Sequence, residues 1–445
     1  MPRITSMILL LLTGACSREQ KSSSGEGAST PSHGSCPAGS SGLTLPAGFC
    51  ATVFADHLGH ARDIVVASNG DVFVNTWGGN NYRTAPPPAG FLVALRDTKH
   101  SGSADTIVRF GPTPDRSATG GTGIALYDGY LYAEAGSDIV RYRLPAGELR
   151  PDTTSETVVS GLPITGDHAM HPFVIDGRGA LYVDVGSATN SCQVDNRQVA
   201  SPGQNPCTEL ETRGGIWKFD ANTTGQSFSP AQRFVTGLRN GVGIAIDPAD
   251  GTVYATQHGR DQLGDNFPAL YTMQQSAELP AEELVHLAAG ADYGWPTCYF
   301  DGAQKKLVLA PEYGGDGGKA VGECANKAPP VAFFPAHWAP DGLVFYSGSM
   351  FPARYRGGIF IAFHGSWNRM VGPQEGYNLV FLPFAQGQSA ATYEIFADGF
   401  AGPAVDPVKA DHRPVGLAVA PDGALFVADD QGGRIWRIAY GAGPS

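Results

Sequence analysis

One structural pattern recurs along the whole sequence. It consists of an apolar strand, a turn with Asp or Gly, a strand of alternating aromatic and aliphatic residues, and a Gly-rich return strand. The clearest copy reads VGLAVAPDGALFVAD at residues 415–429 and ends in GRIWRI at residues 433–438, and five earlier copies begin near residues 64, 123, 173, 242 and 342. One such unit cannot bury both faces of its sheet, so the units are expected to stack in a ring.

The sequence therefore predicts an all-β fold, a six-bladed β-propeller with long loop insertions on the face that carries the active site. Residues 51–54 are expected to close the ring by pairing with the last blade. The alternative folds are a β-sandwich and a two-domain β protein, and the regular recurrence disfavours both. The stretch 281–288 is the one segment expected to form a short helix.

Composition agrees with a folded domain rich in turns. The 445 residues include 59 Gly and 33 Pro, while charged residues make up only 16% and aromatic residues 10%. A disordered chain would carry more charge and fewer aromatic residues. The net charge of −12 argues against a nucleic-acid partner, because binding to phosphates requires concentrated Lys and Arg. Any anionic ligand must therefore meet a local cluster of cations.

The N-terminus predicts export. Arg3 precedes an apolar run at residues 7–12, which is too short to span a bilayer and is followed by the sequence TGAC. We interpret residues 1–16 as a lipoprotein-type signal peptide ending at the lipidated Cys16, with ordinary signal cleavage as the alternative. Residues 17–42 are then a flexible Ser/Gly-rich tether, 43–440 the catalytic propeller and 441–445 a tail. The expected location is the periplasm or the cell surface.

The cysteine count agrees with export. Apart from Cys16 there are six cysteines, an even number that suggests three disulfides in an exported chain. Their spacings match neither a zinc site nor a haem attachment motif. The spacing leaves the connectivity open, and local pairing would give Cys36–Cys50, Cys192–Cys207 and Cys298–Cys324.

Long insertions between strands mark the functional face, because regular blades need only short connections. His168, Arg239 and His337 fall just before or at the start of blade strands, where side chains from separate blades converge on the central channel. His337 and its neighbour Trp338 are candidates for lining the substrate site, although either could simply form part of the channel wall or core. The three insertions are expected at residues 187–214, 259–296 and 297–340.

Five strings together resemble one known family. They are GLRN at 237–240, HGRD at 258–261, GADYGWP at 290–296, HGSWNR at 364–369 and RPVGLAVAPDG at 413–423. In this order on one propeller they closely resemble the sorbosone dehydrogenase family, whose members are relatives of soluble quinoprotein glucose dehydrogenase and use pyrroloquinoline quinone (PQQ). The resemblance extends from about residue 45 to residue 438.

The resemblance implies roles for four side chains. His168 matches the catalytic base, which takes the substrate hydroxyl proton while hydride moves to the quinone. Arg239 and Asn240 match a pair that contacts the cofactor, and the Arg239 guanidinium would also stabilise charge as hydride arrives. Arg369 matches an arginine that binds the cofactor's carboxylates. His171 lies three residues after His168 and is the alternative histidine.

The resemblance also implies a calcium ion. Gly259 and Arg260 match positions whose backbone carbonyls bind Ca²⁺, a hard cation that prefers oxygen ligands and polarises the quinone as a Lewis acid. Asp261 and Asp265 add negative charge nearby.

Two positions depart from the glucose enzymes. Ser347 stands where those enzymes have a lysine that reaches the cofactor, and Ser187 stands where they have an acid that orients the histidine. Asp184 or a backbone group must then orient His168. Both departures disfavour glucose as the substrate and fit the sorbosone-type branch better.

The sequence thus predicts a dehydrogenase dependent on PQQ and calcium that acts on a sugar, ketoaldose or polyol. No haem domain is recognised, so the electrons are expected to pass to a separate quinone or cytochrome. Two other functions remain open, a calcium-dependent lactonase or esterase and a non-catalytic binding propeller. In the latter, His168 would be an ordinary loop histidine, while Arg239 and Arg369 would hydrogen-bond loop carbonyls.

Overall fold

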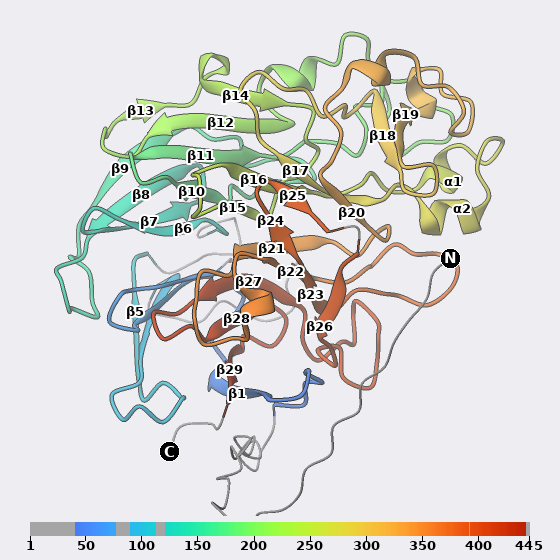
Figure 1. Cartoon of the computed structure of the whole chain (residues 1–445). Helices are drawn as coiled ribbons and strands as arrows, with labels where there is room; N and C mark the ends of the chain where they lie inside the picture. Colours follow the sequence, from blue (N-terminus) through green and yellow to red (C-terminus); the bar gives the residue numbers. More distant parts are fainter. Residues whose placement is uncertain (1–40, 77–89, 113–120, 391, 442–445) are drawn as a thin grey trace, which may run out of the picture. The chain divides into compact units, whose positions relative to one another are not determined.

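Each copy of the repeat forms one sheet in the computed structural model, which describes residues 41–76, 90–112, 121–390 and 392–441 (Figure 1). Blade 1 contains β2 (Ala61–Val66), β3 (Val72–Thr76), β4 (Leu92–Arg96) and β5 (Thr106–Phe110). Blade 2 contains β6 (Ile124–Tyr127), β7 (Tyr130–Ala135), β8 (Asp138–Arg143) and β9 (Ser155–Ser160), with the short β13 (Gln226–Ser227) added in parallel. Blade 3 contains β10 (Phe173–Ile175), β11 (Ala180–Val185), β12 (Gly215–Asp220) and β14 (Arg233–Thr236).

The second half of the chain forms the other three blades. Blade 4 contains β15 (Ile244–Ile246), β16 (Val253–Gln257), β17 (Glu282–His286) and β20 (Ala332–Phe334). Blade 5 contains β21 (Pro340–Phe345), β22 (Ile359–Phe363), β23 (Asn378–Leu382) and β26 (Glu394–Ala397). Blade 6 contains β27 (Pro414–Val419), β28 (Leu425–Asp429), β29 (Ile435–Tyr440) and the N-terminal strand β1 (Phe49–Ala55).

The ring closes as the sequence predicted. β1 pairs antiparallel with β29, and Ala51 lies opposite Ile438 while Val53 lies opposite Trp436. The last blade is therefore built from both ends of the domain, so the ring closes through main-chain hydrogen bonds between distant segments.

The six-bladed prediction is confirmed by the innermost strands. The first strand of every blade lies beside the first strand of the next blade around the ring. These six strands (β2, β6, β10, β15, β21 and β27) together line a channel of about 350 Å³ with mostly apolar walls. Alternating apolar positions place one set of side chains on each face of a strand.

The core lies between the blades. Six hydrophobic clusters are each shared by two neighbouring blades. Trp217 of blade 3 packs with Tyr132 of blade 2, and Trp436 of blade 6 packs with Phe360 of blade 5 in two of these clusters. Each blade thus buries its faces only when a neighbour is present, which is the physical reason for the ring.

The expected helix at 281–288 is wrong, because this stretch contains strand β17. β17 pairs with β16 on one side and β20 on the other, and these main-chain bonds outweigh a weak local preference for helix. The α-helices of the described residues are α1 (Leu263–Asn266) and α2 (Met273–Glu278). The boundary between the second and third predicted insertions must therefore move, because β17 separates α1 and α2 from the hairpin of β18 (Cys298–Asp301) and β19 (Lys306–Leu309).

Smaller elements complete the described chain. They are the hairpin of β24 (Phe384–Ala385) and β25 (Gln388–Ser389) and 3-10 turns at Thr208–Glu211, Pro230–Gln232, Pro311–Tyr313, Gly322–Asn326 and Ala353–Tyr355. No helix among the described residues has the length and apolar character needed to cross a membrane.

Two predicted disulfides are present, Cys192–Cys207 and Cys298–Cys324. Cys50 is also disulfide-bonded, and its expected partner Cys36 lies outside the described residues. The predicted signal peptide with Cys16, nearly all of the tether, and residues 442–445 of the tail lie outside the described residues as well.

Candidate active site

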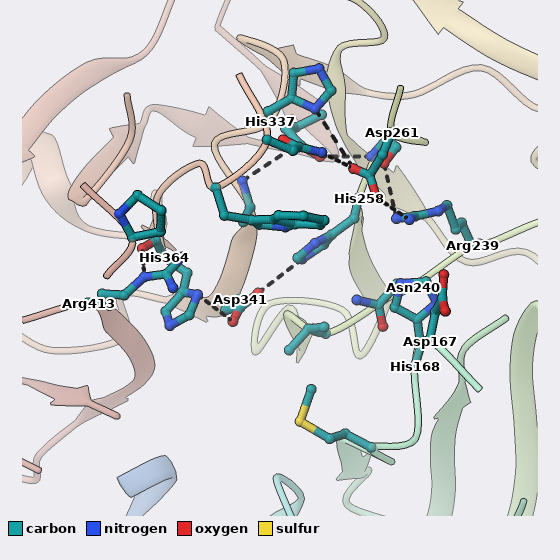
Figure 2. A pocket seen from close by; sticks show the side chains of 18 of the residues that line it. Asp167, His168, Arg239, Asn240, His258, Asp261, His337, Asp341, His364 and Arg413 are labelled. Atoms are coloured by element: carbon teal, nitrogen blue, oxygen red, sulfur yellow. Dashed lines mark hydrogen bonds and ion pairs between the residues drawn. The ribbon is translucent and has the colours of Figure 1, made fainter. Parts of the chain in front are cut away.

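A cavity of about 690 Å³ lies at one end of the propeller, where loops of different blades meet (Figure 2). In an antiparallel blade, the loop that enters the first strand and the loop that leaves the second strand lie at the same end. Entering loops supply His168, Arg239 and Arg413, and the starts of β2 and β21 supply Arg62 and Asp341. Leaving loops supply lining residues that include His258, Gly259, Asp261, His364, Trp367, Asn368 and Gln431. The cavity thus collects polar side chains from blades that are distant in sequence.

His168 is held in one orientation on the cavity wall. Its Nδ1 lies 2.9 Å from the carbonyl oxygen and 3.0 Å from Oγ of Ser187. A carbonyl only accepts hydrogen bonds, so Nδ1 carries the proton in the neutral ring and Nε2 keeps a free lone pair. The approach is close because residue 186 is glycine, where a Cβ would lie 2.6 Å from Cβ of His168.

The electrostatic surroundings keep His168 neutral. Burial lowers the pKa of His168 well below its usual range, and the nearby charge of Arg239 lowers it further. Of the two groups proposed to orient the ring, the backbone carbonyl is the one in contact. Asp184 instead accepts a hydrogen bond from the Gly241 backbone N–H (3.1 Å), and burial raises its pKa to about 8. The site therefore presents a neutral imidazole with a defined tautomer.

His171, the alternative histidine, lies outside the cavity. It is fully buried, and its Nδ1 lies 3.0 Å from a carboxylate oxygen of Glu134. The same carboxylate accepts backbone N–H groups of Thr122 and Gly123 at the entrance to β6. His171 thus joins blades 2 and 3.

Arg239 lies on the same side of the cavity as His168, with Asn240 beside it (Figure 2). Its guanidinium donates to Gly259 O (3.1 Å), to Asp261 Oδ2 (2.9 Å) and to Asn190. Burial raises the pKa of Asp261, but Arg239 and Arg197 outweigh this effect and hold that pKa well below its ordinary value. Asp261 is therefore a carboxylate that fixes two arginines at the cavity.

The opposite wall is a second charged network. Asp341 lies 3.2 Å from Arg62, 3.0 Å from His258 and 3.7 Å from His364. Burial lowers the pKa of His258, but its contact with Asp341 more than compensates and raises that pKa overall. Two histidines of one cavity, His168 and His258, thus have their pKa values pushed in opposite directions.

Arg413 differs from the other arginines of the cavity in the kind of group that it contacts. It donates to the backbone carbonyls of His364 (3.0 Å) and Gly365 (2.7 Å) and lies over the ring of Tyr377. Within the described part of the chain, its guanidinium has no carboxylate partner. Its positive charge is therefore available to an anionic ligand.

His337 lines the cavity, whereas its neighbour Trp338 does not. His337 Nε2 lies 2.8 Å from the carbonyl of Ser276, and its Nδ1 lies 4.0 Å from Asp261. Trp338 packs edge-on against Phe363 in the cluster between blades 4 and 5. Only His337 is thus placed to meet a molecule in the cavity.

Two other predicted cofactor or metal residues point their side chains elsewhere. Arg369 is buried, donates to Pro373 O (3.1 Å) and lies 3.4 Å from Glu278, and it does not line the cavity. Arg260 pairs with buried Glu312. Gly259 does line the cavity, and Asp265 does not.

Sequence reasoning missed Arg62, Arg197 and Asp341. A signal existed for Arg62, because it lies at the start of an innermost strand of the repeat, close to where Arg239 and Arg413 precede theirs. No comparable signal marks Arg197, which comes from within a long loop and reaches Asp167 (2.7 Å) and Asp261 (3.1 Å).

Comparison with known proteins gives partial sequence matches. An uncharacterized protein of Borreliella burgdorferi is 33% identical over 216 residues, covering 46% of this chain and 48% of that protein. The pyrroloquinoline quinone-dependent pyranose dehydrogenase of Coprinopsis cinerea is 27% identical over 239 residues, covering 47% of this chain and 31% of that enzyme. The match therefore spans half or less of the length of these curated relatives.

A solved structure shows the same fold. The calcium structure of the Trichoderma reesei carbohydrate-active enzyme of family AA12 superposes with a TM-score of 0.71 at 21% identity, covering 90% of this chain and 98% of that one. The family described as TrAA12-like matches residues 43–441, which include all six blades. The chain belongs to the TrAA12-like family.

Proposed function

We propose that the chain is a PQQ-dependent dehydrogenase that oxidises a sugar, ketoaldose or polyol and passes the electrons to an external quinone or cytochrome. The observation that carries this proposal is His168, a neutral histidine with a free Nε2 lone pair on the wall of a cavity rich in arginine. The curated Coprinopsis relative, named as a PQQ-dependent pyranose dehydrogenase, supports the same reaction class.

The cavity fits a polycarboxylate cofactor. Its volume of about 690 Å³ lies within the range of small-molecule sites, which is roughly 300–1,000 Å³. PQQ carries three carboxylates, and Arg413 offers a guanidinium whose hydrogen bonds, among the described residues, go to backbone carbonyls. Arg239 adds a second guanidinium, fixed by neighbours that leave it at the cavity surface. Arg369 remains a predicted cofactor ligand, and its present contacts would have to change for it to reach the cavity.

Calcium belongs to the same proposal. Gly259 and Glu282 both line the cavity and supply oxygen atoms, which are the ligands that Ca²⁺ prefers. The backbone carbonyls of Gly259 and Arg260 remain the proposed metal ligands, and the Gly259 carbonyl now accepts a hydrogen bond from Arg239.

In this proposal, His168, Ser187 and Arg239 have separate roles in the oxidation. When bound, PQQ supplies an electrophilic quinone carbon that accepts hydride. The Nε2 atom of His168 would take the substrate hydroxyl proton as the substrate carbon is oxidised, leaving a carbonyl product. Ser187 holds the His168 ring in orientation through Nδ1. The Arg239 guanidinium would stabilise the negative charge that develops as hydride arrives.

A lactonase or esterase is a weaker proposal. Metal-assisted hydrolysis needs carboxylates that converge on one metal, but Asp261 and Asp341 each face arginines or histidines. Among the described residues, one cluster has the spacing of metal ligands, namely Cys192, Cys207 and Glu209, and its two cysteines form a disulfide.

The substrate and the location are part of the proposal too. Ser187 and Ser347 replace charged residues of the glucose enzymes, so we favour a sorbosone-type ketoaldose over glucose. Export as a periplasmic or cell-surface lipoprotein anchored at Cys16 rests on residues 1–16 of the sequence.

Reconstitution tests the function directly. We expect PQQ with Ca²⁺ to bind the purified chain, with a change in quinone absorption, and a panel of aldoses, ketoaldoses and polyols to reduce an artificial dye in the presence of both. Binding of PQQ would be followed by absorbance titration, with PQQ in buffer as the control. A protein that leaves the quinone spectrum unchanged at micromolar PQQ and millimolar Ca²⁺ does not have the proposed function.

The pH dependence of kcat/KM tests the base. Since the pKa of His168 is lowered, the ring stays neutral at pH 6.5, and activity falls only where the pH drops through its shifted pKa. We therefore expect the acidic limb of the profile to lie below the ordinary histidine value of about 6.5. Replacing Arg239 with Gln removes a nearby positive charge and should move that limb upward. A limb at or above pH 6.5 in the unmodified protein would contradict the assignment.

A further inference from the structure

The loop that leaves β11 carries a buried asparagine directly behind Arg239. Asn190 is fully buried and does not line the cavity. Its backbone carbonyl accepts Arg239 Nε (3.1 Å) and Trp295 Nε1 (3.0 Å), and its Oδ1 accepts Arg239 Nη2 (3.1 Å) and the Asp261 backbone N–H (2.8 Å). Its Nδ2 donates to the Asp261 carbonyl (2.9 Å). One asparagine thus contacts both members of the Arg239–Asp261 pair.

The donors of Arg239 are almost fully used on the protein side. A guanidinium has five N–H groups in a fixed plane. Nε donates to Asn190, Nη2 donates to Asn190 and Asp261, and Nη1 donates to Gly259. These four hydrogen bonds fix the plane of the guanidinium and leave one N–H of Nη1 without a partner among the described residues. That N–H can donate a hydrogen bond to an acceptor atom of a molecule in the cavity.

Asn190 is itself held by contacts that do not involve Arg239. The adjacent Thr189 donates to Glu209 from its backbone N–H (2.8 Å) and its hydroxyl (2.7 Å). The Cys192–Cys207 disulfide closes the loop two residues further on. The position of Asn190 is therefore set by the loop, so Asn190 imposes an orientation on Arg239.

The same loop also holds the proposed base. Ser187, three residues before Asn190, binds His168 Nδ1 through its carbonyl and hydroxyl. His168 and Arg239 come from the entrances of two different blades, so a single crosslinked segment sets the orientation of both relative to one another. A displacement of about 1 Å at a reacting group can cost a hundredfold in rate, which makes such a common support important for catalysis.

We propose that Asn190 is a positioning residue that aims the Arg239 guanidinium at the quinone, an inference that rests on the proposed function. Asparagine suits this position because its amide offers an acceptor to Arg239 and to the Asp261 N–H, and a donor to the Asp261 carbonyl. Alanine would remove the side-chain acceptor and donor. Aspartate would keep the acceptor and place a second oxygen against the Asp261 carbonyl.

A double-mutant cycle with Arg239 tests the proposal. We expect Asn190→Ala to lower kcat by about tenfold to a hundredfold and to raise the Kd for PQQ by about tenfold, while the sugar KM changes by less than about twofold. In an Arg239→Lys background, the same substitution should change either quantity by less than about threefold, because the group it positions is gone. Asn222→Ala, in an exposed turn of the same blade, is the matched control and should change nothing.

The outcomes separate a positioning role from a purely structural one. If Asn190→Ala costs as much kcat and PQQ affinity in the Arg239→Lys background as in the otherwise unmodified protein, the proposal is overturned, since a structural defect acts in both. If Asn190→Ala does not fold, Asn190→Asp keeps nearly the same volume. Its second oxygen would repel the Asp261 carbonyl, which accepts from Nδ2 of Asn190 in the unmodified protein, so the Arg239–Asp261 pair should shift and the cycle with Arg239→Lys should again be non-additive.

A readout without cofactor distinguishes this proposal from the proposed function. Absorbance titration of the unmodified protein with PQQ tests the function alone. A crystal structure of apo Asn190→Ala tests the positioning, and we expect the Arg239 guanidinium to leave Asp261 or Gly259. A guanidinium that keeps both contacts in the variant would refute the positioning role, whether or not the protein binds PQQ.

Discussion

Replacing His168 with Gln is expected to lower kcat by about a hundredfold or more, with the Kd for PQQ changed by less than about threefold. Glutamine preserves the polar character and much of the volume of histidine, but its amide nitrogen has no basic lone pair. The variant therefore lacks only the group that receives the hydroxyl proton. Because Nδ1 of His168 is already bound to Ser187, the lost function is that of Nε2.

The measurement is steady-state turnover of the reconstituted protein with its best sugar, together with an absorbance titration for PQQ. His286→Gln is the matched control, since His286 lies at the exposed end of β17 and outside the cavity. It should keep full turnover. A His168→Gln variant that retains more than about a tenth of the kcat would exclude His168 as the base.

Replacing Asp261 with Asn is expected to lower the free energy of unfolding by about 3 kcal/mol. Asp261 is buried and contacts Arg239 at 2.9 Å and Arg197 at 3.1 Å. The amide of asparagine keeps the shape but carries no charge, so two arginines lose their shared carboxylate in a region of low dielectric. Removing one member of a buried ion pair costs far more than the pair contributes when complete.

Urea unfolding followed by tryptophan fluorescence measures this change. Glu394→Gln is the control, because its ion pair with Arg354 (2.6 Å) lies at the surface with side chains 42% and 55% exposed, and it should cost less than about 1 kcal/mol. A loss for Asp261→Asn no larger than that of the control would mean that Asp261 is not needed to hold the arginines. Added PQQ should restore part of the lost stability, since a bound anion replaces the missing charge.

The contrast between the whole chain and the cavity has a physical meaning. The chain carries a net charge of −12, yet Arg62, Arg197, Arg239 and Arg413 all line one cavity. Three of these arginines pair with carboxylates, and Arg413 contacts backbone carbonyls. The carboxylates thus hold three guanidinium groups in place when the cavity is empty, whereas the positive charge of Arg413 is available to an anionic ligand.

The sequence by itself determined the architecture. The repeat period specified six blades, and the apolar β1 segment specified closure with the last blade, because alternating residues and turn residues act locally on each unit. The same pattern located the loops that enter the innermost strands. His168, Arg239 and His337 could therefore be assigned to one cavity from their positions before β10, β15 and β21.

Only the tertiary structure decided the direction of individual side chains. Arg369 and Trp338 lie next to residues of the cavity wall but turn toward Pro373 and Phe363. Residues 282–286 form a strand because β16 and β20 offer main-chain partners on both sides. Asn190 contacts Arg239 because a disulfide and Glu209 hold its loop in place. These outcomes depend on contacts between segments far apart in the chain, and a local pattern of residues does not contain the energies of such contacts.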